Sequence, residues 1–85
     1  MMSRKIVVIG ASTGIGNALV HVAAKEKDCK IIAFARNTEL MEESFKSLSN
    51  VSFQYLDLEN IHTDEFTTKL NQFGPIDILI NNAGF

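Results

Sequence analysis

The chain has 85 residues, of which 46% are hydrophobic, and a formal net charge of −2. This length allows one small domain, the apolar content predicts a folded core, and the negative charge argues against nucleic-acid binding. Cys29 is the single cysteine, which excludes an internal disulfide and a cysteine metal cluster. The apolar run after Arg4 and Lys5 is too short for a signal-peptide core or a membrane span, which predicts a cytoplasmic protein without membrane partners.

The first elements surround a cluster of glycines. Residues 5–9 are rich in β-branched side chains and predict a strand buried on both faces. A helix is expected over residues 14–26, with an apolar stripe formed by Ile15, Ala18, Leu19, Val22 and Ala23. The glycine-rich turn between them is typical of an anion site, because the first helical turn leaves N–H groups unpaired at the positive end of the helix dipole. The alternative is a tight turn that binds nothing, since the spacing differs from G-x-G-x-x-G.

Three more strands alternate with two more helices. Strands are expected over residues 30–35, 51–56 and 76–80, and helices over residues 38–48 and 61–73. This alternation predicts an α/β fold with a doubly wound parallel sheet in the order 3-2-1-4, in which the first and fourth strands are neighbours.

Two polar, glycine-containing loops are expected to meet at one edge of this sheet. Residues 10–16 follow the first strand, and residues 81–84 follow the fourth. Ligands bind outside the carboxyl ends of parallel strands where the winding direction reverses, which is between these two strands. The two loops therefore predict a ligand crevice at this edge.

The residues after the second strand indicate which dinucleotide would bind. An acidic residue at this place bonds the ribose 2′-hydroxyl and selects NAD. The sequence has Arg36 here and no carboxylate, and a guanidinium suits a 2′-phosphate, which favours NADP over NAD. The alternative is a solvated arginine in a loop. Thr13 leaves the glycine loop without a second basic residue.

Asp57 follows the third strand at the same edge of the sheet. Its carboxylate could accept a hydrogen bond from an adenine amino group, with Leu58 packed on the ring, or it could cap a turn. His21 and His62 lack metal-ligand spacing and are expected in solvent. Cys29 is expected to pack as a small residue near a strand start.

Three motifs together resemble the short-chain dehydrogenase/reductase family. They are Gly10-Ala11-Ser12-Thr13-Gly14-Ile15-Gly16, Asp57-Leu58 and Asn81-Asn82-Ala83-Gly84, and the resemblance covers residues 1–85. Ile9 stands where the family motif has threonine. The resemblance implies a Rossmann-type sheet and hydride transfer between a nicotinamide dinucleotide and a small-molecule carbonyl or alcohol.

The resemblance also implies roles for individual residues. The contacts to the pyrophosphate and adenosine would be Gly10, Ser12, Thr13, Gly14, Ile15 and Gly16. Arg36 resembles the 2′-phosphate ligand of the family's NADP users, while Asp57 and Leu58 resemble its adenine contacts. The contacts to the ribose nearer the nicotinamide would be Asn82, Ala83 and Gly84, with Asn81 bracing the sheet.

No catalytic residue of the family is found in the chain. The family's serine, its Tyr-x-x-x-Lys pair and a further asparagine lie beyond the Asn-Asn-Ala-Gly motif, and Tyr55 is followed at the fourth position by Glu59. Residues 1–85 are therefore expected to be the NADP-binding, N-terminal part of an oxidoreductase, ending after the fourth strand and inactive alone. The alternatives are a non-catalytic nucleotide-binding module and an interaction fragment.

The fourth strand is expected to form an apolar edge through Ile76, Ile78, Leu79 and Ile80. An unpaired apolar edge strand pairs readily with another chain. The chain is therefore expected to self-associate, or to need a further segment beside this strand.

Overall fold

The computed structural model describes residues 4–57, 59–60 and 63–82, and strands and helices alternate along them as predicted. The strands are β1 (Arg4–Ile9), β2 (Cys29–Ala35), β3 (Val51–Tyr55) and β4 (Ile78–Asn81). The helices are α1 (Gly14–Ala24), α2 (Thr38–Phe45) and α3 (Thr63–Asn71). All strand pairs are parallel and the order is β3-β2-β1-β4, which confirms the predicted doubly wound sheet.

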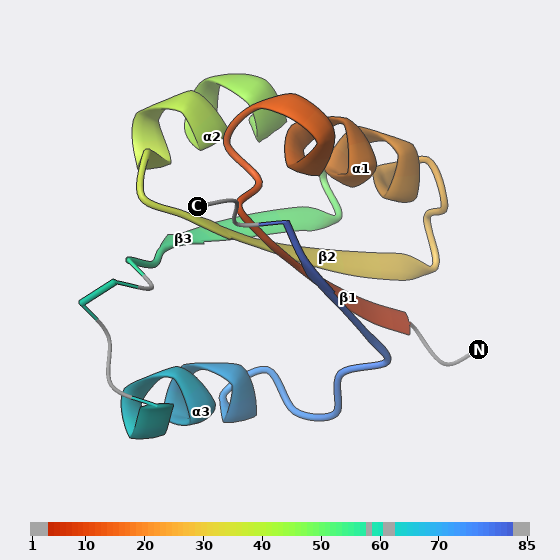
Figure 1. Ribbon diagram of the computed structural model, residues 1–85. Helices are drawn as coiled ribbons and strands as arrows, with labels where there is room; N and C mark the ends of the chain where they lie inside the picture. Colours follow the sequence, from red (N-terminus) through yellow and green to blue (C-terminus); the bar gives the residue numbers. More distant parts are fainter. Residues whose placement is uncertain (1–3, 58, 61–62, 83–85) are drawn as a thin grey trace.

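The sheet lies between two layers of helices. Helices α1 and α2 cover one face, and α3 covers the other (Figure 1). In the central strand β1, Val8 packs in the apolar cluster on the face of α1 and α2, whereas Val7 packs in the cluster on the face of α3. Because both faces are covered, β1 is a continuous apolar run and not an alternating one.

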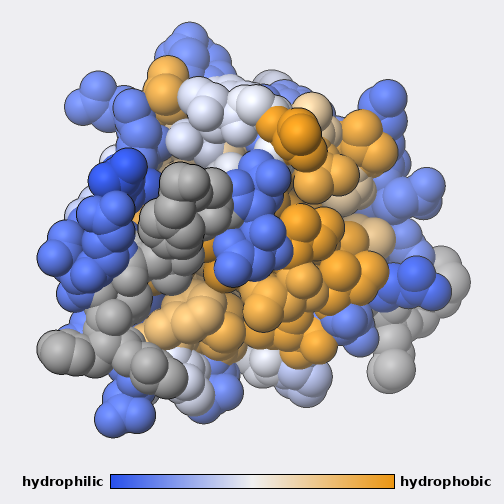
Figure 2. Space-filling model, in the orientation of Figure 1, coloured by the Kyte–Doolittle hydropathy of each residue, from blue (hydrophilic) through white to orange (hydrophobic). Residues whose placement is uncertain are grey.

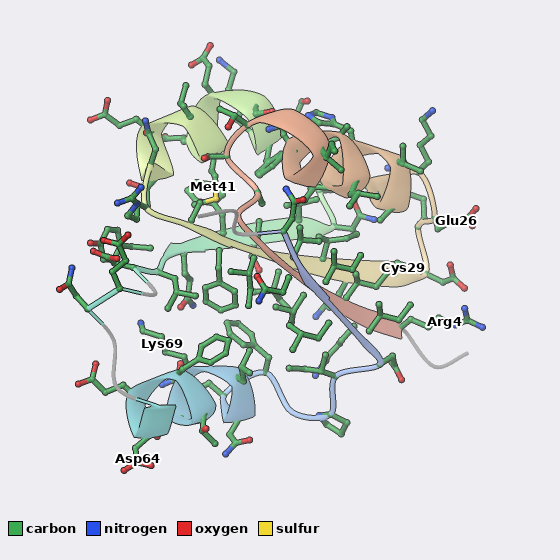
Figure 3. All side chains as sticks on the ribbon, viewed as in Figure 1. Arg4, Glu26, Cys29, Met41, Asp64 and Lys69 are labelled. Atoms are coloured by element: carbon green, nitrogen blue, oxygen red, sulfur yellow. The ribbon has the colours of Figure 1, made fainter. Side chains whose placement is uncertain are left out.

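Each helical layer contributes buried or half-buried side chains to its cluster. Met41 and Phe45 of α2 are buried, and Met41 points from the helix towards the sheet (Figure 3). On the other face, Phe66 and Leu70 of α3 and the following Phe73 pack against the cluster, as predicted from their helical spacing. Cys29 is buried at the start of β2, which confirms its predicted packing role.

Helix α1 buries a different face from its predicted apolar stripe. Its buried residues are Gly16, Val20 and Ala24, whereas Ile15 and Val22 are 70% and 62% exposed. The physical reason is the close approach of the helix to the turn beneath it, which only a residue without a side chain permits at position 16. This contact fixes the rotation of α1 and turns Ile15 and Val22 outwards.

Strand β4 is shorter than predicted and forms one edge of the sheet. Asp77 precedes it: the Lys5 N–H donates to the Asp77 carboxylate over 2.8 Å, and the Asp77 N–H donates to the Lys5 carbonyl over 2.9 Å. Ile78 and Leu79 are 43% and 51% exposed, as predicted for an apolar edge, whereas Ile76 and Ile80 are half-buried because they pack against the two apolar clusters of the core. Figure 2 shows the exposed apolar side chains gathered over β4 and α1.

Candidate functional site

A pocket of about 420 Å³ lies at the carboxyl ends of the strands, where the sequence predicts a ligand crevice. Residues that follow each of the four strands reach it. The lining residues are Ile9, Gly10, Ser12, Thr13, Gly14, Ile15, Ala35, Arg36, Asn37, Leu56, Asp57, Glu59 and Asn82. Gly16 is buried behind the glycine loop, while the predicted contacts Leu58, Ala83 and Gly84 lie outside the described residues.

The glycine loop is held to the end of β2 by its backbone. The N–H groups of Gly10 and Ala11 donate to the Phe34 carbonyl over 2.8 and 3.2 Å. Gly10 and Gly14 have φ angles of +81° and +64°, which residues with a Cβ rarely adopt. These angles bend the chain sharply from β1 into α1, so that the N-terminus of α1 lies at the pocket.

Gly16 brings the start of α1 against the neighbouring loops. A Cβ on this residue would lie 2.1 Å from the Gly10 carbonyl oxygen and 2.9 Å from Nδ2 of Asn82. The Asn82 N–H in turn donates to the Ile9 carbonyl over 2.9 Å. The glycine loop and the end of β4 are therefore in direct contact, as the predicted strand order requires.

Arg36 lies at the pocket directly after β2. Its side chain is exposed and forms no hydrogen bond or ion pair within the part of the chain that the structure describes. The next residue, Asn37, caps α2 by accepting a hydrogen bond from the Leu40 N–H over 3.0 Å. The cap fixes the backbone beside Arg36 and leaves its guanidinium available to a ligand.

Asp57 lines the pocket and also caps a turn. Its carboxylate accepts hydrogen bonds from the Asn60 amide over 2.7 Å and from the Glu59 N–H over 3.1 Å. The Asn60 bond lowers the pKa of Asp57, with the Glu59 N–H and the charge of Arg36 acting in the same direction. The carboxylate is thus ionised at neutral pH. The turn-capping interpretation is confirmed, and pocket contact coexists with it.

A polar cluster beside the glycine loop involves residues that the sequence did not single out for the site. Asn17 and His21 of α1 both contact the Ser44 hydroxyl of α2, over 2.9 Å each. The His21 ring lies 5.5 Å from the Phe45 ring, so the expectation of a solvated His21 is wrong. An asparagine in the first turn after a glycine loop was the available signal, because its amide can reach back to the loop.

The described residues contain no group of three or more His, Cys, Asp or Glu side chains that could hold a metal ion. None of the helices formed by these residues is long and apolar enough to cross a membrane.

The family model described as short chain dehydrogenase matches residues 4–85. A 3-dehydrosphinganine reductase of Arabidopsis thaliana is 33% identical over 84 residues, which cover 95% of this chain and 25% of the reductase. An NADP-dependent 3-hydroxy acid dehydrogenase of Schizosaccharomyces pombe is 33% identical over 89 residues, covering 95% of this chain and 34% of that protein.

A solved structure has the same fold as this chain. The NADPH-dependent reductase YwfH, involved in bacilysin biosynthesis, superposes with a TM-score of 0.79 at 28% identity, covering 96% of this chain and 35% of that chain. The chain therefore spans about a third or less of each of these three proteins.

Proposed function

Because this chain belongs to the short-chain dehydrogenase/reductase family, we propose that it forms the NADP(H)-binding part of an oxidoreductase. The proposed reaction is hydride transfer between NADP(H) and a carbonyl or alcohol. The dinucleotide supplies or accepts the hydride, and the residues of this chain bind and orient it. The chain alone is proposed to bind without catalysis, because its single tyrosine, Tyr55, has Glu59 and not lysine at the fourth following position.

The observation that carries this proposal is the convergence of four strand ends on one pocket. The glycine loop and the N-terminus of α1 offer N–H groups to a pyrophosphate. Arg36 offers a planar set of donors on the adenosine side. Asn82 borders the pocket from β4, next to the glycine loop, and is proposed to contact the ribose nearer the nicotinamide.

The preference for NADP is proposed from the charges at the pocket. The end of β2 carries Arg36 and no carboxylate. The carboxylates that line the pocket, Asp57 and Glu59, come from the segment after β3, and Asp57 already accepts two hydrogen bonds within its turn. Two relatives whose names state NADP or NADPH dependence support the same preference.

Calorimetric titration of the chain with NADPH and NADH tests the proposal. We expect saturable binding with NADPH favoured. Arg36→Ala should weaken NADPH binding by about ten- to a hundredfold, the value of a charge-assisted hydrogen bond to phosphate, and should hardly change NADH binding. Equal loss for both dinucleotides would contradict a 2′-phosphate role.

Arg4→Ala is the matched control, since Arg4 is the other arginine of the chain. It is exposed and lies at the start of β1, beside Cys29 and at the opposite end of the strands from the pocket (Figure 3). This variant should bind both dinucleotides like the unaltered chain.

A further inference from the structure

The Asn17 side chain turns back from the first turn of α1 towards the glycine loop. Its Nδ2 donates to the carbonyl oxygens of Ala11 and Ser12, over 3.3 Å each, and to the Ser44 hydroxyl over 2.9 Å. Carbonyl oxygens only accept hydrogen bonds, which fixes the amide nitrogen on this side. Asn17 therefore acts on the backbone of the loop and not on a ligand.

Ser44 sets the orientation of this amide. The amide nitrogen carries two hydrogens for three acceptors, so the short contact to Ser44 takes one and the two loop carbonyls share the other. Ser44 is itself held by Nε2 of His21 at 2.9 Å, and the His21 ring packs on Phe45, which is 2% exposed. Ser44 and Phe45, at the C-terminal end of α2, thus keep the second amide hydrogen of Asn17 directed at the glycine loop.

Peptide planarity carries this restraint to the pocket. In a trans peptide the C=O and the N–H point in opposite directions. Drawing the carbonyls of Ala11 and Ser12 towards Asn17 therefore turns the N–H groups of Ser12 and Thr13 away from it. Both residues line the pocket, and neither N–H has a hydrogen-bond partner among residues 4–57, 59–60 and 63–82.

We propose that Asn17 is a positioning residue, oriented by Ser44, that holds the Ser12 and Thr13 N–H groups towards the pyrophosphate of a bound dinucleotide. The inference rests on the proposed NADP(H) binding. It predicts a specific pattern, because a ligand without a pyrophosphate does not use these N–H groups. Adenosine 2′-monophosphate (2′-AMP) is such a ligand, since its single phosphate is the one that Arg36 is proposed to bind.

The test compares NADPH with 2′-AMP on the unaltered chain and on Asn17→Leu, which keeps the size of the side chain and removes its donors. We expect Asn17→Leu to weaken NADPH binding by about tenfold, as the loss of a hydrogen-bonded anchor predicts, and to leave 2′-AMP binding unchanged. Arg36→Ala should weaken both ligands. Asn71→Leu, at an exposed position on α3, is the matched control and should change neither.

Ser44 is tested in the same way. Ser44→Ala removes the acceptor that orients the amide but leaves the two carbonyl contacts possible, so a smaller loss of about threefold for NADPH alone is expected. Ser47→Ala is the matched control, because Ser47 is exposed just beyond α2.

The outcomes separate this inference from the proposed function. If Asn17→Leu binds NADPH like Asn71→Leu, the positioning role is wrong while the proposed function stands. If NADPH and 2′-AMP weaken equally, Asn17 only stabilises the domain, and the inference is again overturned. Failure of the unaltered chain to bind NADPH would overturn both.

Discussion

Gly16 is the residue at which the glycine loop, α1 and the end of β4 come closest together. A side chain there would meet the backbone oxygen of Gly10 at a distance that no Cβ tolerates, and it would also meet the side-chain amide of Asn82. Gly14, two residues earlier, has open space around its missing Cβ but a φ of +64°. The two glycines are therefore required for different reasons, close approach at one and backbone conformation at the other.

Gly16→Ala should accordingly be more damaging than Gly14→Ala. For Gly16→Ala we expect a loss of about 3 kcal/mol in the free energy of unfolding, because the contact is with backbone that cannot move aside. For Gly14→Ala we expect a loss of about 1 kcal/mol, the cost of a left-handed conformation. Urea denaturation of the two variants measures the difference, and equal midpoints would contradict this assignment.

At the scale of elements, the sequence predicted the order of the strands and helices but not the rotation of α1 about its own axis. The strand–helix alternation sufficed to predict the sheet order, and the positions of the glycines and Arg36 sufficed to predict most of the pocket. Both depend on local sequence pattern and on topology rules. The inward face of α1 was not predictable from its apolar residues. The buried face of α1 consists of Gly16, Val20 and Ala24, whereas Ile15 and Val22 of the expected stripe are exposed.

The side-chain network around Asn17 was not predictable for a related reason. Its members, Asn17, His21 and Ser44, come from two helices whose relative rotation the sequence does not specify. Polar side chains at such positions look solvated in a helical projection. Only the packing of α1 beside α2 brings them within hydrogen-bond distance.

Asn50 joins the end of α1 to the strands and gives a prediction at this scale. Its Nδ2 donates to the carbonyls of Ala24, Glu26 and Cys29 over 3.1, 3.2 and 3.0 Å. Asn50→Leu leaves these carbonyls without that donor but also removes a buried Oδ1 that has no partner among the described residues. We expect a net loss of about 1–2 kcal/mol in the free energy of unfolding.

The same urea denaturation measures this effect, with Asn71→Leu as the control for an exposed asparagine. Asn50→Leu should leave the NADPH preference intact, because Asn50 does not line the pocket at the carboxyl ends of the strands. Stability equal to that of Asn71→Leu would show that solvent replaces the three contacts without cost.

At the scale of the whole molecule, the β3 edge and the β4 edge of the sheet differ in the side chains that they expose to solvent. On the β3 side, α2 and the turn after β3 carry charged residues, including Glu42, Glu43 and Glu59. On the β4 side, Figure 2 shows an apolar surface over β4 and α1, and the exposed large apolar residues of these two elements are Ile15, Val22, Ile78 and Leu79. A large apolar face beside an edge strand favours association with another surface.

The isolated chain is accordingly predicted to self-associate through this face. Leu79→Lys places a charge on the edge strand, where the cost of burying it opposes pairing with a second strand. We expect this variant to shift the sedimentation-velocity profile towards the monomer. Leu40→Lys is the control, because Leu40 is an exposed apolar residue of α2, 44% exposed against 51% for Leu79. An equal shift of the profile in both variants would mean that general surface hydrophobicity, and not the β4 edge, drives association. A monomeric unaltered chain would contradict the prediction altogether.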